Sequence, residues 1–266
     1  IARLLSRLGV PTTLCTALGG ESGRVARALI AAEPMQLRAV DTHEANGTWV
    51  HDRRSGERRA VAEAPGRPLS RHAADELFGG ALAAGMEAGL CVLAGSHHGV
   101  VPASHYRRLA ADLRANGTLV VADLSDGELL AALEGGLDFC KISDVDLARS
   151  HDLSADDLLG TVREVQRSGA ENVAVTQADE GLLVALGADA FEIRPPRLEV
   201  VDHRGAGDAF TAVVTASRYW GMDWIDAVRW GTAAGALTVV RRGLATADRR
   251  EIHQLLDRVS VLPVSP

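Results

Sequence analysis

The sequence has little of several features that mark particular classes of protein. Lys141 is its single lysine, and its 28 Lys and Arg residues are outnumbered by 35 Asp and Glu residues, which gives a formal net charge of -7. This balance argues against general binding to nucleic acids or to anionic membranes, although a local basic pocket can still hold a phosphate ester. We therefore expect a small-molecule ligand and no nucleic-acid or membrane partner.

Cysteine, aromatic residues and long apolar runs are also scarce. Cys15, Cys91 and Cys140 are odd in number, widely spaced and set in apolar contexts, which favours reduced thiols over disulfides or a structural zinc site. No apolar stretch reaches the roughly 18 to 20 uncharged residues that span a bilayer. Reduced thiols are typical of a cytoplasmic protein, which we expect here. With 47% hydrophobic residues in 266, the chain can also bury a substantial core.

From about residue 88 onward, apolar strand-like runs alternate with amphipathic helical stretches. "LCVLAG" is followed by "ASHYRRLAADLRANG" and then by "TLVVADL". This is the rhythm of βαβ units, in which helices cover both faces of a parallel sheet. The pattern predicts a three-layer α/β/α body with a mainly parallel sheet, formed by residues 1–36 and 67–266.

Residues 37–66 have a different pattern. "NGTWVHDRRSGERRAVAEAPG" alternates polar and apolar residues on either side of "RSGE", which predicts two antiparallel strands joined by a hairpin turn. The exposed face of this hairpin would be strongly charged. We interpret residues 37–66 as a small β lid inserted into the body.

Two glycines and an acid occur together in "VDHRGAGDAF", residues 201–210, just where an apolar helical run begins. Glycines allow a tight turn with exposed N–H groups, and the helix adds the positive end of its dipole, so this corner attracts anions. Asp208 at its rim is suited to taking a proton from a group that attacks a phosphate. The alternative is a structural strand–turn–helix joint with a favourable first-turn acid. A dinucleotide motif is weaker, because Phe210 stands where the third glycine of G-x-G-x-x-G belongs.

The surrounding segments favour the catalytic interpretation. "DHRGAGDAFTA", "VTQADEG", "LDFCKISDVDL" and "GTAAGALTVVRRG" occur in the order and at the approximate spacings of the PfkB-type, ribokinase-like sugar kinases. The resemblance extends over nearly the whole chain and is strongest to the branch of 1-phosphofructokinase and tagatose-6-phosphate kinase. It implies an ATP-dependent, Mg²⁺-requiring carbohydrate kinase with the fold that the strand pattern predicts.

By this resemblance Asp208 matches the catalytic base, which takes the proton of the acceptor hydroxyl. The amides of Gly205, Ala206 and Gly207 match the anion hole, which stabilises charge on the phosphoryl group in flight. A single corner would then position both the donated phosphate and the base.

The nucleotide side matches the family less closely. The resemblance assigns nucleotide contacts to Lys141, Thr176, Ala178, Gly181 and Thr232, with Ala178 standing where the family has glycine. The same loop can also be an ordinary turn between strands.

The metal side departs from the family pattern as well. Asp146 replaces the glutamate that organises the water bound to Mg²⁺, and Ser143 replaces an asparagine. Aspartate can serve with a shorter reach. The alternative is a helix start with Asp144 and Asp146 as favourable first-turn acids.

The segment that matches the acceptor-binding motif departs furthest from the family pattern. Where the branch has Thr-Arg-x-Asn, this chain has His43-Glu44-Ala45-Asn46, so Glu44 and Asn46 are the matching substrate residues, and Glu44 would repel a phosphorylated sugar. The family's Gly-Gly-x-x-Asn motif and one further strand would precede Ile1. Lids of this family often pair between subunits, which implies a homodimer through the lid.

Two rival functions stay open. A nucleoside kinase of the same superfamily would need an aromatic pocket, and only two tyrosines and four phenylalanines are present. A non-catalytic regulator that binds nucleotide or sugar phosphate is favoured by the departures at Glu44, Ser143, Asp146 and Ala178. The intact GAGD segment argues against it.

Overall fold

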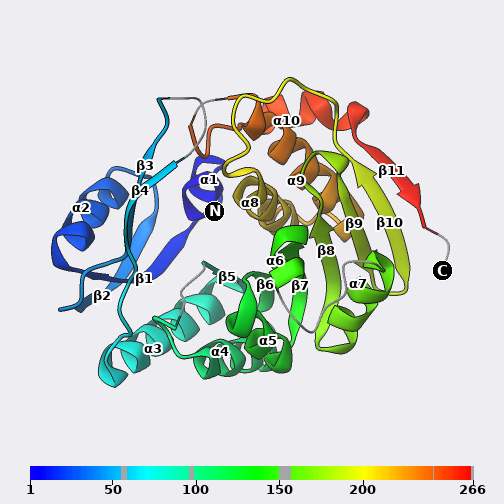
Figure 1. The fold of residues 1–266 in the computed structure, drawn as a ribbon. Coiled ribbons are helices and arrows are strands. Elements are labelled where there is room, and N and C mark those ends of the chain that lie inside the picture. The colour runs from blue at the N-terminus through cyan, green and yellow to red at the C-terminus, as the bar shows by residue number, and fades with distance from the viewer. Residues whose placement is uncertain (55–58, 96–98, 150–156, 242, 265–266) are drawn as a thin grey trace.

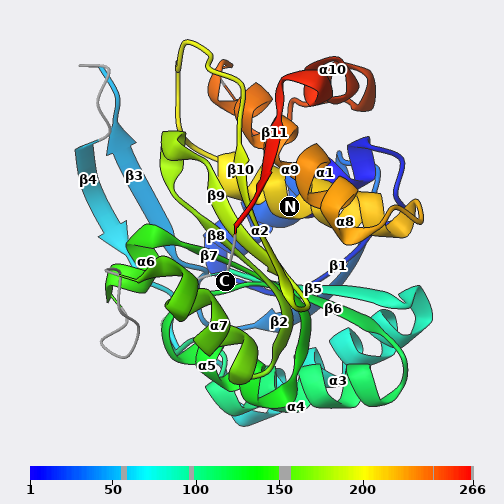
Figure 2. The ribbon, with the colours of Figure 1, turned by 90° about the vertical axis from the view of Figure 1, so that its right-hand side faces the viewer.

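The computed structural model describes residues 1–54, 59–95, 99–149, 157–241 and 243–264. Its largest element is a sheet of seven strands (Figures 1 and 2). In spatial order these are β11 (Ser260–Pro263), β10 (Asp189–Arg194), β9 (Leu182–Leu186), β8 (Ala170–Thr176), β7 (Leu137–Ser143), β6 (Leu119–Asp123) and β5 (Leu90–Ala94). Strands β5 to β8 are parallel, while β9, β10 and β11 continue the sheet in antiparallel pairs.

Helices cover both faces of this sheet, as the strand pattern predicts (Figure 1). One core cluster joins the sheet to α1 (Ala2–Arg7), α8 (Ala206–Tyr219), α9 (Trp224–Val239) and α10 (Arg249–Leu255). The other joins it to α4 (Ala103–Ala115), α5 (Asp126–Gly135) and α7 (Leu158–Arg167), with α3 (Arg71–Ala88) packed beside it. The three-layer α/β/α architecture is thereby confirmed.

Strand β6 shows why the apolar runs form buried strands. Val120, Val121 and Ala122 are all fully buried, yet Val121 belongs to one core cluster and Val120 and Ala122 to the other. Successive side chains of a strand point to opposite faces, so a strand covered on both faces must be apolar at every position.

The small residues of α9 serve close packing against α8. A Cβ on Gly231 would lie 2.7 Å from Val214 Cγ2 and 3.0 Å from the Phe210 carbonyl oxygen, so the two helices approach too closely for any side chain there. The tryptophans nearby also pack within the protein: Trp224 stacks on Phe139 at 5.1 Å between ring centroids. These contacts show that small and aromatic side chains of α9 pack against α8 and the sheet.

The N-terminal part forms a separate parallel pair, β1 (Thr13–Gly19) and β2 (Gln36–Thr42), with α2 (Gly20–Ala31) between them in sequence. The two predicted antiparallel strands are confirmed as β3 (Thr48–Asp52) and β4 (Arg59–Ala64), which pair with each other. The predicted turn falls on residues 55–58, which lie outside the described residues. Because β2 occupies the start of the 37–66 segment, we use "lid" below for β3, β4 and the residues that flank them; the division into body and lid stays a prediction.

The cysteines are free thiols, as expected. Burial raises the pKa of the Cys140 thiol far above its usual value, so this thiol stays protonated. In the part of the chain that the structure describes, no helix is long and apolar enough to cross a membrane.

Candidate active site

The GAGD corner begins α8. Gly205 is the residue before the first helical turn and has φ 82°, a left-handed conformation that favours glycine. The next N–H groups, of Ala206, Gly207 and Asp208, belong to the first turn, where a helix has no carbonyl partner of its own for them. The start of α8 therefore offers backbone donors and a positive dipole end to an anion.

Lys141 lies directly beneath this corner. It sits on β7 and is only 8% exposed, and its Nζ is 3.0 Å from Asp123 Oδ1 on the neighbouring strand β6. The second carboxylate oxygen, Asp123 Oδ2, accepts a hydrogen bond from Thr211 Oγ1 of α8 at 2.7 Å. One carboxylate thus joins β6, β7 and α8.

This placement explains the second glycine of the motif. A Cβ on Gly207 would lie 2.9 Å from Lys141 Nζ, so a side chain there would press on the ammonium group. Without one, the single lysine of the chain brings its positive charge up to the turn that carries the N–H donors. A buried ammonium beside free N–H groups is an arrangement suited to phosphate.

Asp123 and Thr211 were not predicted as site residues. Asp123 ends a buried parallel strand and is in register with Lys141 on the next strand, so the rule that ligands lie at the carboxyl ends of parallel strands points to it. Thr211 carries no such signal, because its contact joins residues 88 positions apart in the sequence.

The predicted nucleotide loop joins β8 to β9. Gln177 N–H donates to the Gly181 carbonyl at 2.8 Å, and Gly181 has φ 111° with the Ile193 carbonyl oxygen 2.4 Å from the place of a Cβ. Ala178 has φ 46°, in the left-handed region that costs an L-residue roughly 1–2 kcal/mol. The backbone therefore keeps a conformation suited to the family's glycine although the residue is alanine.

Thr176 and Thr232 direct their hydroxyl groups to backbone carbonyls. Thr176 Oγ1 donates to the Ile142 carbonyl at 3.4 Å, and the buried Thr232 donates to Val228 within α9 at 2.8 Å. Their assignment to the nucleotide stays a prediction.

Asp146 lies in α6 (Asp144–Arg149), just after β7. Ser143 Oγ donates to Asp146 Oδ2 at 2.5 Å, and the Asp146 N–H donates back to Ser143 Oγ at 3.1 Å, which is the geometry of a helix start. Among the described residues no three His, Cys, Asp or Glu side chains gather into a metal site. A single carboxylate such as that of Asp146 fits Mg²⁺ held mainly by water and substrate phosphates, which is how Mg²⁺ usually binds in kinases.

On the acceptor side, Asn46 connects the lid to the body. Its Oδ1 accepts the Gly19 N–H at 2.9 Å, and its Nδ2 donates to the Ala17 carbonyl at 2.9 Å. Glu44 has a partner too, because its Oε2 lies 3.5 Å from Arg67 Nη1. The Arg67 cation offsets part of the repulsion that Glu44 would exert on a phosphorylated sugar.

A cavity of about 1050 Å³ lies between the β1–β2 pair and the seven-stranded sheet, whose strand β5 lines it. Its mostly apolar walls include β1 and β5, and Asn46 and Asp208 both line it. Asp208 is exposed at this wall. The structure therefore brings the predicted base and one predicted acceptor residue to the same cavity.

The sequence pattern that defines the pfkB family of carbohydrate kinases matches residues 1–250. The chain belongs to this family. It is a carbohydrate kinase, a class of enzyme that transfers phosphate to a hydroxyl group, and it resembles the phosphofructokinases.

Individual relatives support this assignment. ATP-dependent 6-phosphofructokinase isozyme 2 of Mycobacterium tuberculosis is 27% identical over 97% of this chain and 77% of its own length. A 1-phosphofructokinase of Vibrio cholerae is 26% identical over 66% of this chain and 56% of its own length. The crystal structure of Escherichia coli phosphofructokinase-2 with fructose-6-phosphate superposes with TM-score 0.81 at 23% identity, covering 96% of this chain and 84% of that one. At this identity the superposition establishes the ribokinase-like fold.

Proposed function

We propose that this kinase transfers the γ-phosphate of ATP to a hydroxyl of a sugar or sugar phosphate. Asp208 would be the general base, and the Gly205, Ala206 and Gly207 amides the anion hole. One observation carries the proposal: the left-handed turn at Gly205 sets Asp208, the first-turn N–H groups and the Lys141 ammonium around the start of α8. The base then lies at the wall of the cavity that Asn46 also lines, and the proposed anion site is at the same helix start.

The chemistry follows from this arrangement. The Asp208 carboxylate accepts the proton of the acceptor hydroxyl as its oxygen bonds to the γ-phosphorus. The bond from the γ-phosphorus to the bridging oxygen breaks, and ADP leaves with the electron pair. The first-turn amides and Lys141 stabilise the charge on the phosphoryl oxygens during transfer.

Asp146 would orient Mg²⁺ through water. The metal supplies further neutralisation of the phosphate charges when bound. Asp123 holds Lys141 in place, which keeps its ammonium directed to the corner.

The lid covers the acceptor side in this proposal, and it is also the proposed dimer contact. The lid strands expose large apolar side chains, with Trp49 48% and Val61 64% exposed. Exposed apolar groups on a two-stranded ribbon are suited to contact with a second copy of the same ribbon.

The test is acceptor-dependent ADP release with Mg-ATP across free sugars, hexose phosphates and nucleosides. The Asp208→Asn variant should lower kcat by about 10²- to 10⁴-fold with the preferred acceptor. Asp226→Asn is the matched control, because Asp226 is the third residue after the N-cap of α9, as Asp208 is after the N-cap of α8. The control removes the same charge from an equivalent helix turn and should keep wild-type turnover.

The acceptor panel also decides between the rival functions. Turnover with nucleosides alone would replace the sugar proposal by a nucleoside kinase. ATP binding without turnover on any acceptor would favour a ligand-binding regulator. Equal turnover of Asp208→Asn and wild type would remove Asp208 from the role of base.

A further inference from the structure

An ion pair connects the lid to the loop that leads into the GAGD corner. Arg53 directly follows β3, and its Nη2 lies 2.7 Å from Asp202 Oδ2, although the two residues are 149 positions apart. We propose that Arg53 and Asp202 form a latch that holds the lid against the loop before the GAGD corner, and that Arg53 is a positioning residue for the transfer reaction. The functional part rests on the proposed kinase activity.

Asp202 is held in place from the body side. Its Oδ1 accepts the Arg204 N–H at 3.2 Å, and the N–H groups of Val201 and Asp202 donate to the Val239 carbonyl at 2.8 and 3.0 Å. The Asp202 side chain is only 18% exposed. The carboxylate is therefore a fixed point at the end of α9, next to the turn that sets Gly205.

The two adjacent arginines of the lid, Arg53 and Arg54, have different partners. Arg54 pairs with Asp52 inside the lid, with Arg54 Nη2 2.7 Å from Asp52 Oδ2. Arg53 instead reaches the body, and its guanidinium lowers the pKa of the Asp202 carboxyl. The pair thus stays ionised throughout the neutral range.

A polar latch matters here because the lid buries little apolar surface against the body of its own chain. Every residue of β4 is exposed in the single chain, so hydrophobic packing against the body holds this strand only weakly. An exposed ion pair contributes little on its own, but in an element with so few other contacts it shifts the balance between a seated and a displaced lid.

The latch pair does not include Asp208, Lys141 or the first-turn N–H groups, to which the proposal assigns the transfer reaction. Loss of Arg53 should therefore raise KM for the acceptor and increase ATP hydrolysis without acceptor, because water reaches the site more often. The value of kcat at saturating acceptor should change little. A residue needed only for folding would not produce this division.

The experiment compares hydrogen exchange and kinetics in the full chain and its variants. Arg53→Gln and Asp202→Asn should each speed exchange in peptides from β3, β4 and residues 199–205, and raise acceptor KM, by ~2- to 5-fold. Asn at position 202 can still accept the Arg204 N–H, so the turn is kept. The double variant should show no more than either single change, since both break the same pair.

Two controls make the comparison specific. Arg53→Lys should show exchange rates and an acceptor KM close to those of wild type, because lysine keeps the positive charge. Arg54→Gln removes the adjacent arginine, whose partner is inside the lid, and should leave exchange at residues 199–205 unchanged. Added salt should reduce the difference between Arg53→Gln and wild type.

Wild-type exchange in Arg53→Gln, or an equal effect of Arg54→Gln on residues 199–205, would overturn the latch. Additive effects in the double variant would overturn it as well. A wild-type chain that phosphorylates no acceptor would instead count against the proposed function, and the exchange comparison would still decide whether the latch exists.

Discussion

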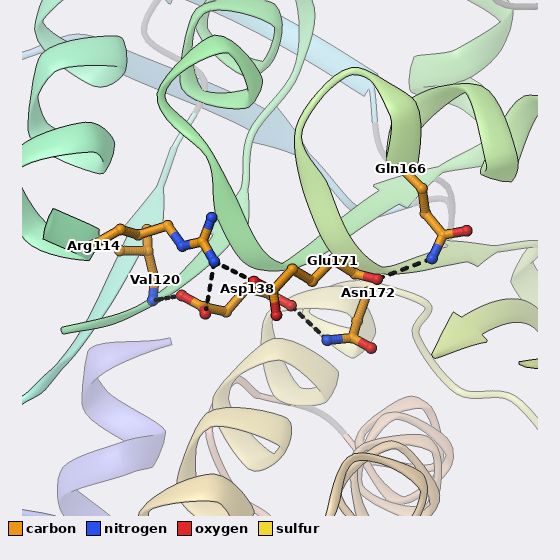
Figure 3. A network of polar contacts seen from close by, with 6 residues as sticks. All are labelled: Arg114, Val120, Asp138, Gln166, Glu171 and Asn172. Carbon is orange, nitrogen blue, oxygen red and sulfur yellow. Dashed lines mark hydrogen bonds and ion pairs between the residues drawn. The ribbon is translucent and has the colours of Figure 1, made fainter. Parts of the chain in front are cut away.

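Strands β6 and β7 carry a polar cluster at each end, and the two clusters use similar groups in different surroundings. At the amino end, the carboxylate of Asp138 accepts the Val120 N–H at 2.7 Å and lies 3.5 Å from Arg114 Nη2 (Figure 3). Arg114 also pairs with Glu171, and Asn172 donates to the Asp138 carbonyl at 2.8 Å. These contacts tie β6, β7, β8 and α4 together.

At the carboxyl end, Asp123 of β6 pairs with Lys141 of β7, so both partners are on strands, whereas Arg114 belongs to α4. Lys141 lies under the start of α8, where Gly207 leaves room for its ammonium, and the cavity between β1 and β5 reaches Asp208 in the same turn. The proposed function therefore assigns ligand binding to the end where the ion pair meets a helix start and a cavity, and a structural role to the other end. Ligands of parallel sheets usually bind at the carboxyl ends of the strands.

The largest expected effect comes from removing one partner of the buried pair. Asp123→Asn leaves Lys141 buried without its counterion and should lower the free energy of unfolding by about 3–5 kcal/mol. It should also reduce turnover per folded molecule, because Lys141 loses its position. Urea unfolding together with turnover measures both.

Asp138→Asn is the control at the other end of the strands. Asparagine can still accept the Val120 N–H, so we expect a loss of about 1–3 kcal/mol from the weakened pair with Arg114 and unchanged kcat. A fall in kcat for Asp138→Asn as large as that for Asp123→Asn would contradict the division between a structural and a ligand-binding end.

A smaller expected effect, on activity alone, comes from filling the space above Lys141. Gly207→Ala places a Cβ against the ammonium and should lower kcat by ~10²-fold, the size expected when a catalytic group is displaced by about 1 Å. Gly127→Ala is the matched control, since Gly127 is the second residue after the N-cap of α5, as Gly207 is after the N-cap of α8, and nothing lies within 4 Å of its added Cβ. Wild-type kcat in Gly207→Ala would show that this space is not needed.

The smallest expected effect concerns the strained alanine of the nucleotide loop. Ala178→Gly should raise the free energy of unfolding by about 1 kcal/mol, because glycine adopts φ 46° without strain. Ala245→Gly relieves a similar φ of 57° away from the nucleotide loop and should give a similar gain. Only Ala178→Gly should also tighten ATP binding, measured by calorimetry; an equal effect of both variants on ATP would remove the loop from the nucleotide site.

Local features were predictable from the sequence. The buried strands, the covering helices and the antiparallel pair β3–β4 follow from periodicity within short segments, and Gly205 follows from its place before an apolar helix. These features depend on neighbours a few residues away, so the sequence pattern contains them.

Contacts between distant segments were not predictable in the same way. Thr211 and Asp123 are 88 residues apart in the sequence, and Arg53 and Asp202 are 149 apart. A pattern within a short segment does not predict contacts between residues so widely separated. Asn46 was predicted from the family pattern as an acceptor residue, but its hydrogen bonds to Gly19 and Ala17 appear only when the lid is placed against β1.

Transfer of labelled phosphate from γ-labelled ATP to the preferred sugar acceptor tests the central claim most directly. The account predicts that wild type and Asp226→Asn label the acceptor at equal rates, and that Asp208→Asn does so about 10²- to 10⁴-fold more slowly. Equal labelling by Asp208→Asn, or label released only as inorganic phosphate by wild type, would contradict it.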